Sequence, residues 1–266
     1  MDEVLYTLDD GIGVVTLNRP DRLNALNAAM HERLYETWDE IKGDKRVRAI
    51  VITGTGRGFC VGMDLQQAST SGFRKHTSNR VADIQKMTAL NNGIWTPTIV
   101  AINGVVSAGG LHFVADADVV IASEAASFVD SHVNVGQVSA LEPISLMPRI
   151  GLGNALALSV MGNAGRIDAH AALRIGLVNE VVPHDQLLTR AMHLAREAAK
   201  GSPAAVEGTK RAIWAALDRP FGEAMQLGWD ILVAHRDHPD AIEGPKAFAE
   251  KRPPNWNLSP SVAAGR

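Results

Sequence analysis

The chain contains 266 residues, of which 46% are hydrophobic and 21% charged, and its formal net charge is −3. These proportions are typical of a globular protein and exclude a wholly disordered chain, a collagen and a coiled coil. No basic stripe is visible, so the sequence does not favour a nucleic-acid partner.

The chain carries no sign of export or membrane insertion. The single cysteine, Cys60, cannot form an internal disulfide, and the acidic start Met1-Asp2-Glu3 is unlike a secretory signal. The longest apolar stretch, 98–122, is interrupted by Asn103, His112 and acidic residues, so it is too polar for a spanning helix. We therefore expect a cytoplasmic protein without a membrane partner.

The first part of the chain predicts a hairpin and then a helix. Residues 5–8 and 12–18 are rich in β-branched residues and are separated by Asp9-Asp10-Gly11, which favours a tight turn between antiparallel strands. Apolar residues recur every three or four positions over 27–42, which predicts a helix with one buried face.

The middle of the chain alternates strand and helix patterns. Short apolar segments predict four buried strands, at 49–53, 98–102, 119–122 and 176–182. A second amphipathic helix is expected over 81–94. Strands that alternate with helices favour an α/β core with parallel pairing.

The end of the chain predicts helices only. From about residue 187 no strand pattern remains, and the helical segments are separated by prolines; we expect helices at 187–200, 204–217, 221–234 and 240–251.

The segment that follows the strand at 98–102 places paired glycines, Gly109 and Gly110, where a helix begins at Leu111. Backbone N–H groups are unpaired at such a start and would stabilise a developing oxyanion. The alternative is that the glycines only permit close packing of helix and strand. From this motif alone, both interpretations stay open.

Other motifs match known sites incompletely. The glycines at 54–58 lack the third glycine of a dinucleotide-binding fingerprint. Ser107 has a glycine two residues later but Val105 two residues earlier, which makes a serine hydrolase an outside alternative. His235 and His238 could imitate metal ligands, but a charged, solvated helix end is the favoured interpretation, because a metal site needs further ligands that the sequence does not place.

Two segments together resemble a known family. Residues 58–65 (GFCVGMDL) and 102–122, from Ile-Asn-Gly through Ala-Gly-Gly to Asp-Val-Val-Ile-Ala, look like the two signature segments of the crotonase superfamily, which comprises the enoyl-CoA hydratases and isomerases. The resemblance continues in the expected order through 17–26, 176–183 and 202–252. It covers nearly the whole chain.

The resemblance implies a fold and an assembly. The expected fold is α/β, a crotonase-like spiral of ββα units over residues 1–200, followed by a C-terminal helical trimerisation region at 201–266. Such proteins usually assemble as homotrimers or homohexamers and act on acyl-CoA thioesters. No metal or separate cofactor is implied, since coenzyme A enters only as part of the substrate.

The resemblance also implies site residues. The N–H groups of Met63 and Gly109 correspond to the oxyanion hole, whose two donors polarise the thioester carbonyl and stabilise an enolate. The segment 66–80 is expected to cover the acyl group. The residues expected along coenzyme A are Arg22, Leu23, Ala25, Gly62, Asp64 and Leu65, with Phe248 and Lys251 reaching it from a neighbouring subunit.

The sequence departs from the hydratase pattern at the acid and base. Hydratases of the family carry two glutamates where this chain has His112 and His132. Histidine transfers protons efficiently near neutral pH, so we expect both to be catalytic. Glu142 is a further candidate, as a base or to orient His132, although it could equally be a residue favoured at a helix start. Asp130 is a weaker candidate for orienting a histidine.

These residues favour an enzyme of the enoyl-CoA hydratase/isomerase family that stabilises a thioester enolate by a reaction other than ordinary hydration. Asp-x-His followed by glycine also resembles the superfamily hydrolases that cleave a carbon–carbon bond in cyclic β-diketones, such as 6-oxocamphor hydrolase. A non-catalytic acyl-CoA-binding member is the third possibility.

Overall fold

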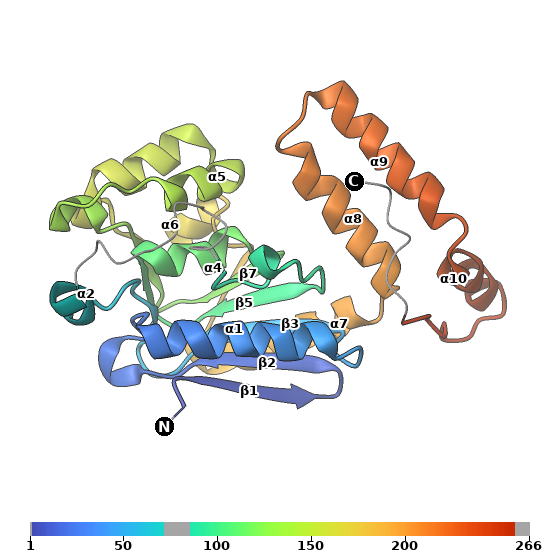
Figure 1. Ribbon diagram of the computed structural model, residues 1–266, viewed down its shortest axis with the longest axis horizontal. Helices are drawn as coiled ribbons and strands as arrows, with labels where there is room; N and C mark the ends of the chain where they lie inside the picture. Colours follow the sequence, from blue (N-terminus) through green and yellow to red (C-terminus); the bar gives the residue numbers. More distant parts are fainter. Residues whose placement is uncertain (1, 72–85, 259–266) are drawn as a thin grey trace.

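The computed structural model describes residues 2–71 and 86–258, and they form two β-sheets with surrounding helices (Figure 1). The six-stranded sheet has the order β1-β2-β3-β5-β7-β10, and the four-stranded sheet has the order β4-β6-β8-β9. The first sheet comprises β1 (Val4–Asp9), β2 (Ile12–Leu17), β3 (Ala49–Gly54), β5 (Thr98–Ile102), β7 (Val119–Ser123) and β10 (Glu180–Val182). The second comprises β4 (Gly58–Cys60), β6 (Val105–Ser107), β8 (Ser127–Val129) and β9 (Ile167–Asp168).

Consecutive strands alternate between the two sheets. β3, β5 and β7 pair in parallel in the first sheet, and the strand that follows each of them, β4, β6 or β8, lies in the second. A helix comes after each pair, namely α2 (Leu65–Ser71), α4 (Leu111–Ala115) and α5 (Leu141–Val160). This repeat confirms the expected spiral of ββα units.

The N-terminal hairpin forms as expected. β1 and β2 pair antiparallel, from Val4 opposite Leu17 to Asp9 opposite Ile12. Between them Asp10 and Gly11 both have positive φ, 45° and 79°. Aspartate and glycine tolerate this conformation, which a tight two-residue turn requires.

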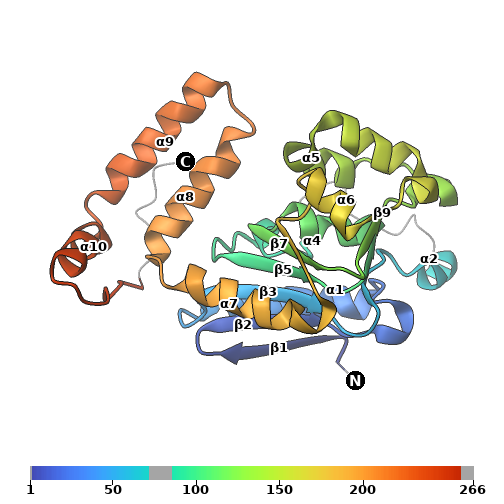
Figure 2. The same cartoon turned by 180° about the vertical axis from the view of Figure 1, so that it is seen from behind.

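The central strands bury both faces. On β3, Ile50 and Ile52 belong to the hydrophobic cluster of α1 (Ala28–Gly43), whereas Ala49 and Val51 belong to that of α7 (Leu187–Ala199). Successive strand residues point to opposite faces, so each helix receives every second side chain. Figure 1 shows α1 in front of the sheet and Figure 2 shows α7 on the other side.

The last three helices extend away from the sheets. α8 (Pro203–Ala216) and α9 (Phe221–His235) pack against each other, and α10 (Pro239–Ala249) follows at the far end (Figure 1). Nζ of Lys210 on α8 lies 2.7 Å from Oδ2 of Asp118 and joins this region to the core. The expected boundary at residue 200 falls between α7 and α8, and assembly into a trimer or hexamer stays a prediction.

Besides the four short strands of the second sheet, which the local patterns did not predict, three segments differ from the expected elements. Residues 72–85 lie outside the described residues, and 86–94 contain only the short 3₁₀ turn Leu90–Asn92 instead of the rest of a helix. There the side-chain amide of Asn92 donates to the carbonyls of Lys86 and Thr88, a local bonding that competes with a helix. The strand expected at 176–182 is limited to β10.

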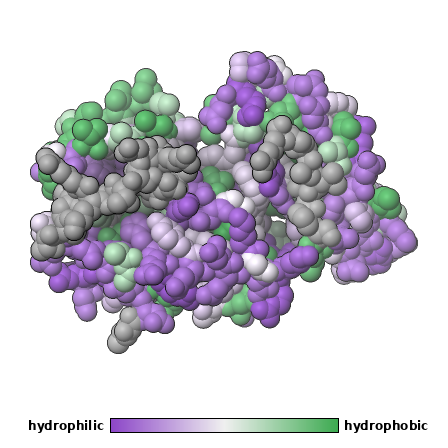
Figure 3. Space-filling view, in the orientation of Figure 1, coloured by the Kyte–Doolittle hydropathy of each residue, from purple (hydrophilic) through white to green (hydrophobic). Residues whose placement is uncertain are grey.

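The third difference is α5, which the sequence did not predict. It contains Pro148 and a kink at Gly151, which obscure the helical pattern. Several apolar side chains of α5 point outward and form the hydrophobic patch at the upper left of Figure 3: Ile144, Met147, Leu152, Leu156 and Val160. Within the described part of the chain, no helix is both long and apolar enough to cross a membrane.

Candidate active site

A cavity of about 780 Å³ opens beside the ends of β6 and β8. Its wall contains both polar and apolar side chains, as suits a ligand with both kinds of groups. The expected site residues on its wall are Arg22, Leu23, Ala25, Met63, Asp64, Leu65 and His132. Residues 66–71 of the expected covering segment belong to α2, and 72–80 lie outside the described residues.

Asn24 explains why Arg22 and Leu23 reach the cavity. Its buried side chain donates to the carbonyls of Thr55 and Gly58 and accepts the N–H of Arg19, so it fastens a sharp turn. Leu23 and Asn24 themselves have positive φ, 50° and 55°. The turn directs the neighbouring side chains outward into the cavity.

Asp64 is engaged in structure as well as lining the cavity. Its Oδ2 lies 2.9 Å from Nη2 of Arg19, and its Oδ1 accepts the N–H groups of Gln66 and Gln67 at the start of α2. Burial opposes ionisation, but the bonds from Arg19 and these N–H groups outweigh it and lower the pKa of Asp64. The carboxylate therefore holds the segment that follows Met63.

The backbone around Met63 leaves one N–H group unused. Leu26 donates to the carbonyl of Gly62 at 2.7 Å and accepts the N–H of Asp64 at 2.9 Å. In such a parallel bridge the N–H of the residue between them, Met63, points away from Leu26. Among the described residues, neither this N–H nor that of Gly109 bonds to a backbone or side-chain acceptor.

Two glycines allow the segments of Met63 and Gly109 to approach each other. Gly62 has a φ of 81°, and a Cβ placed on it would lie 2.8 Å from both Ala108 Cβ and Gly109 N. A Cβ on Gly110 would lie 2.3 Å from the carbonyl oxygen of Cys60. Both positions exclude a side chain, so close packing is a real function of the glycine motif.

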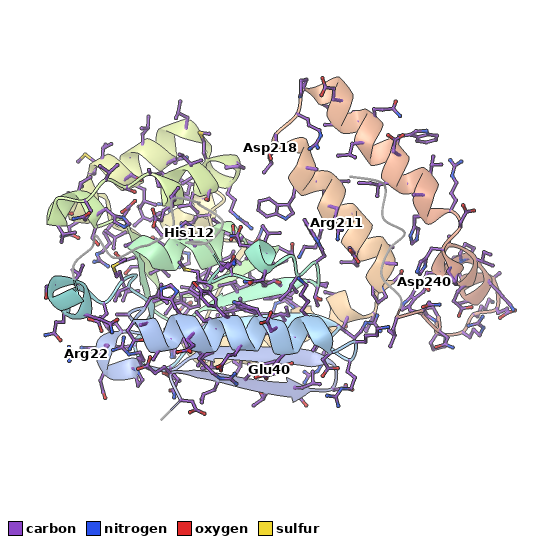
Figure 4. The ribbon with its side chains drawn as sticks, in the orientation of Figure 1. Arg22, Glu40, His112, Arg211, Asp218 and Asp240 are labelled. Atoms are coloured by element: carbon purple, nitrogen blue, oxygen red, sulfur yellow. The ribbon has the colours of Figure 1, made fainter. Side chains whose placement is uncertain are left out.

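His112, His132 and Glu142 meet behind the cavity wall, although 20 and 10 residues separate them in sequence. Nε2 of His112 on α4 lies 3.3 Å from Oε1 of Glu142 on α5, and Nε2 of His132 lies 3.8 Å from the same oxygen. Figure 4 shows His112 in the interior of the protein. Only His132 of the three lines the cavity.

Burial and charge act in opposite directions on Glu142. The carboxyl is buried, which would raise its pKa, but the hydrogen bond and charge of His112, together with the charge of His132, outweigh burial and lower it. Glu142 is therefore an ionised group between two imidazoles. Nδ1 of His112 is buried and has no partner among the described residues.

Asp130 is a hydrogen-bond partner of His132. It is fully buried, and its Oδ1 lies 2.7 Å from Nδ1 of His132 and also accepts the backbone N–H of His132. Its other oxygen accepts the hydroxyl of Ser139. The pKa of His132 is raised. The hydrogen bond to Asp130 is the largest cause, the charge of Glu142 adds to it, and burial opposes both.

From the sequence, Asp130 was a weaker candidate than Glu142 for orienting His132, and Ser139 was not a candidate. Asp130 has its own pKa lowered, because the bonds from His132 and Ser139 outweigh a large burial effect. The short spacing Asp-x-His was the available signal. No sequence pattern indicated Ser139, because only the folded structure brings its hydroxyl to the carboxylate of Asp130.

Several expected residues do not line the cavity. Gly62, Gly109, His112 and Glu142 are not part of its wall. Gly62 and Gly109 are next in sequence to Met63 and Ala108, which are part of it. Glu142 lies 3.8 Å from His132, and His112 lies 3.3 Å from Glu142. Phe248, which is 87% exposed, and Lys251 lie on or just after α10. That helix is at the opposite end of the molecule from α2 and Arg22, so one chain does not bring them to the cavity (Figures 1 and 4).

The alternative motifs gain no support from the geometry. The hydroxyl of Ser107 lies in the cavity wall, but its partner is the hydroxyl of Ser131, 3.0 Å away, and not a histidine. The described residues contain no group of three side chains able to hold a metal ion, and His235 and His238 stack with ring centroids 5.2 Å apart.

Comparisons with known proteins give one consistent result. The family profile described as enoyl-CoA hydratase/isomerase matches residues 7–259. A probable enoyl-CoA hydratase of Rhodobacter capsulatus is 33% identical over 95% of this chain and 97% of its own length. The 1,2-epoxyphenylacetyl-CoA isomerase of Escherichia coli is 30% identical over 96% of this chain and 98% of its own.

A solved structure agrees with these sequence relatives. An enoyl-CoA hydratase/isomerase from Mycobacterium paratuberculosis superposes with a TM-score of 0.88 and 36% identity. The match covers 97% of this chain and 99% of that one.

Proposed function

The chain belongs to the enoyl-CoA hydratase/isomerase family, and on that premise we propose that it converts acyl-CoA thioesters through an enolate, with His132 as the residue that transfers the proton. The observation that carries this proposal is a cavity lined by Met63 and His132, in which Asp130 bonds to the ring of His132 and Glu142 lies 3.8 Å from it, while the segment of Gly109 packs against Gly62 next to Met63.

The N–H groups of Met63 and Gly109 are the proposed carbonyl site. Both lack acceptors among the described residues, and the glycine contact at Gly62 holds their segments together. Two donors aimed at a thioester oxygen stabilise the enolate more than the thioester itself, because negative charge builds on that oxygen in the transition state. Removing one such donor typically costs about 2.7–4 kcal/mol.

The proton step requires a base beside the carbonyl site. A proton leaves the carbon next to the thioester carbonyl for the imidazole of His132, and the electron pair of the broken C–H bond moves toward the carbonyl oxygen. Return of the proton to a different carbon completes an isomerisation. His112 and Glu142 do not line the cavity, so we assign them to supporting His132: Glu142 faces the ring, and His112 holds Glu142.

The cavity wall fits a thioester of coenzyme A. Arg22 supplies a cation, and Leu23, Ala25 and Leu65 supply apolar surface. Phe248 and Lys251 would reach the nucleotide only from a neighbouring subunit, so this part of the proposal requires an oligomer. Analytical ultracentrifugation tests it: a protein that stays monomeric while it binds acyl-CoA normally would contradict it.

The test of the central proposal is deuterium exchange. Acyl-CoA thioesters of several chain lengths are incubated with the protein in D₂O, and mass spectrometry follows exchange next to the carbonyl. We expect exchange with the wild type and a loss of about 10²–10⁴-fold in His132→Ala. His170→Ala, which changes an exposed histidine on α6 (Ala169–Arg174), is the control. Thioester binding with no exchange or turnover would support a non-catalytic binding protein instead.

A second function is favoured by the Asp130–His132 pair. A histidine oriented by a buried carboxylate can activate water, as hydrolysis of a carbon–carbon bond in a β-dicarbonyl compound requires. The same N–H groups would stabilise the enolate that leaves. Turnover of a cyclic β-diketone with no exchange in any thioester would favour this function over the first.

A further inference from the structure

We propose that Asp130, held by Ser139, is a positioning residue that keeps the proton of His132 on Nδ1 and so makes Nε2 the atom that exchanges a proton with the substrate. This inference rests on the proposed function of His132. It adds to that function the identity of the reacting nitrogen and the two residues that select it.

The contacts of Asp130 leave its carboxylate little freedom. One oxygen accepts both the ring Nδ1, at 2.7 Å, and the backbone N–H, at 3.2 Å, of the same residue, His132. The second oxygen accepts the hydroxyl of Ser139. Because Asp130 is fully buried, water cannot replace these partners, and the ring is held relative to its own backbone.

These contacts determine which nitrogen carries the proton. An ionised carboxylate only accepts hydrogen bonds, so Nδ1 must be the donor in the pair with Asp130. In the neutral ring Nε2 is then the free base. It lies 3.8 Å from Glu142, beyond a normal hydrogen bond, so no protein atom described here saturates it.

The position of the ring gives this choice of nitrogen a chemical meaning. His132 lines the cavity and is 22% exposed, whereas Asp130 lies behind it. The charged groups that face His132 are Asp130 from the end of β8 and Glu142 from α5, with His112 of α4 next to Glu142. The other charged residues on the cavity wall are Arg22, Asp64 and Arg166.

A structural role for Asp130 would predict a different result. If its bonds only stabilised the loop after β8, their loss would lower the melting temperature and leave the chemistry of His132 unchanged. The pH dependence of kcat/KM separates these roles, because it reports the ionisation of the essential base in the free enzyme. The hydrogen bond to Asp130 is the largest cause of the raised pKa of His132, so its removal must move that ionisation to lower pH.

The experiment uses the full chain and compares Asp130→Asn with Asp240→Asn. Asp240 is a matched control, because it is also buried and also bonded to a serine, Ser202, but lies in α10 far from His112 (Figure 4). We expect Asp130→Asn to lose about 10²–10⁴-fold in kcat, since the amide can donate to Nδ1 and favour the wrong tautomer. The rising limb of its pH profile should move to lower pH. Asp240→Asn should keep both the rate and the profile.

A milder pair of variants tests Ser139. Ser139→Ala should lower kcat about tenfold, whereas Ser139→Thr, which retains the hydroxyl, should recover most of the rate. ¹⁵N chemical shifts of the His132 ring should show the proton on Nδ1 in the neutral wild type and a change in Asp130→Asn.

The outcomes distinguish the two proposals. If His132→Ala loses exchange but Asp130→Asn keeps the wild-type rate and pH profile, the positioning role is wrong and the proposed function stands. If His132→Ala itself exchanges normally, the proposed function fails. A wild-type ring with its neutral proton on Nε2 would also overturn the inference.

Discussion

Two regions of this protein each bring together a serine, an aspartate and a histidine. The histidine of the first region, His132, lines the cavity, whereas that of the second, His238, is buried. Near β8, Asp130 bonds to Ser139 and to Nδ1 of His132. Beside α10, Asp240 bonds to Ser202, but Nδ1 of His238 lies 3.9 Å from its carboxylate.

The two histidines use Nδ1 in opposite ways. In His132 it donates to a carboxylate, whereas in His238 it accepts the backbone N–H of Asp240 and caps α10. The ring of His238 is only 3% exposed, against 22% for His132. A serine, an aspartate and a histidine therefore do not make a site by themselves. Whether such a histidine can act on a substrate depends on the group that bonds to Nδ1 and on whether Nε2 reaches a cavity.

The largest expected difference is in turnover. His132→Ala should lower kcat/KM for the thioester by about 10²–10⁴-fold, because it removes the proposed proton carrier. His238→Ala should stay within about twofold while its melting temperature falls, because a buried helix cap is lost. Steady-state kinetics and thermal denaturation measure both. Equal kinetic losses in the two variants would remove the distinction.

Glu142 is a second carboxylate near His132, whereas among the described residues only Asp240 lies within ion-pair distance of His238. Glu142→Gln keeps the shape of the side chain but removes its charge, and we expect a roughly ten- to hundredfold loss of kcat/KM. The pH profile should also move to lower pH, because Glu142 contributes to the raised pKa of His132. The control is Glu180→Gln, which breaks an ion pair with Arg190 of α7 and should leave the kinetics unchanged. An unshifted profile in Glu142→Gln would contradict the role of Glu142.

The contribution of the Asp130–His132 pair to the free energy of unfolding should decrease at both low and high pH. The lowered pKa of Asp130 stabilises the fold above its ordinary value of 3.8, and this stabilisation is lost as pH falls through the lowered value. The raised pKa of His132 stabilises the fold below its ordinary value of 6.5, and this is lost as pH rises through the raised value. Asp130→Asn should therefore cost about 1–3 kcal/mol in the window between, and less outside it. Urea denaturation across this range measures the cost, and a constant difference would show that the pair is not ionised.

The smallest effect is expected at Ser202. Its hydroxyl accepts the N–H of Ala205 at 3.1 Å, which caps α8, and donates to Asp240. Ser202→Ala should cost about 1–2 kcal/mol of unfolding free energy with no change in kcat/KM. A kinetic defect in this variant would contradict a purely structural role for Ser202 at the start of α8.

Local patterns predicted much of the fold. The Asp10-Gly11 turn needs positive φ at both residues, which the amino-acid types permit, so the hairpin could be predicted from four or five positions. The strand at 98–102 is apolar from residue 99 to residue 102 because it is buried on both faces. By contrast, 86–94 has a helical apolar spacing but folds around side-chain bonds of Asn92, and spacing does not report such bonds.

The residues of the candidate site could be predicted from the sequence, but the hydrogen bonds between them could not. His112, His132 and Glu142 were all expected near one another. In the structure Nε2 of His112 and Nε2 of His132 lie 3.3 and 3.8 Å from Oε1 of Glu142. Which carboxylate bonds to Nδ1 of His132 depends on the side-chain rotamers and on where α5 places Glu142. Neither follows from the spacing of these residues in the sequence.

Gly62 sets the distance between two halves of the cavity by contact of main chain with main chain. The side chain of Met63 takes no part in that contact, and neither do the rings of His112 and His132. The frame can therefore keep its dimensions while these side chains are exchanged. This makes the protein a practical starting point for redesign: new acid and base groups can be introduced one at a time, with the glycine left untouched as the spacer.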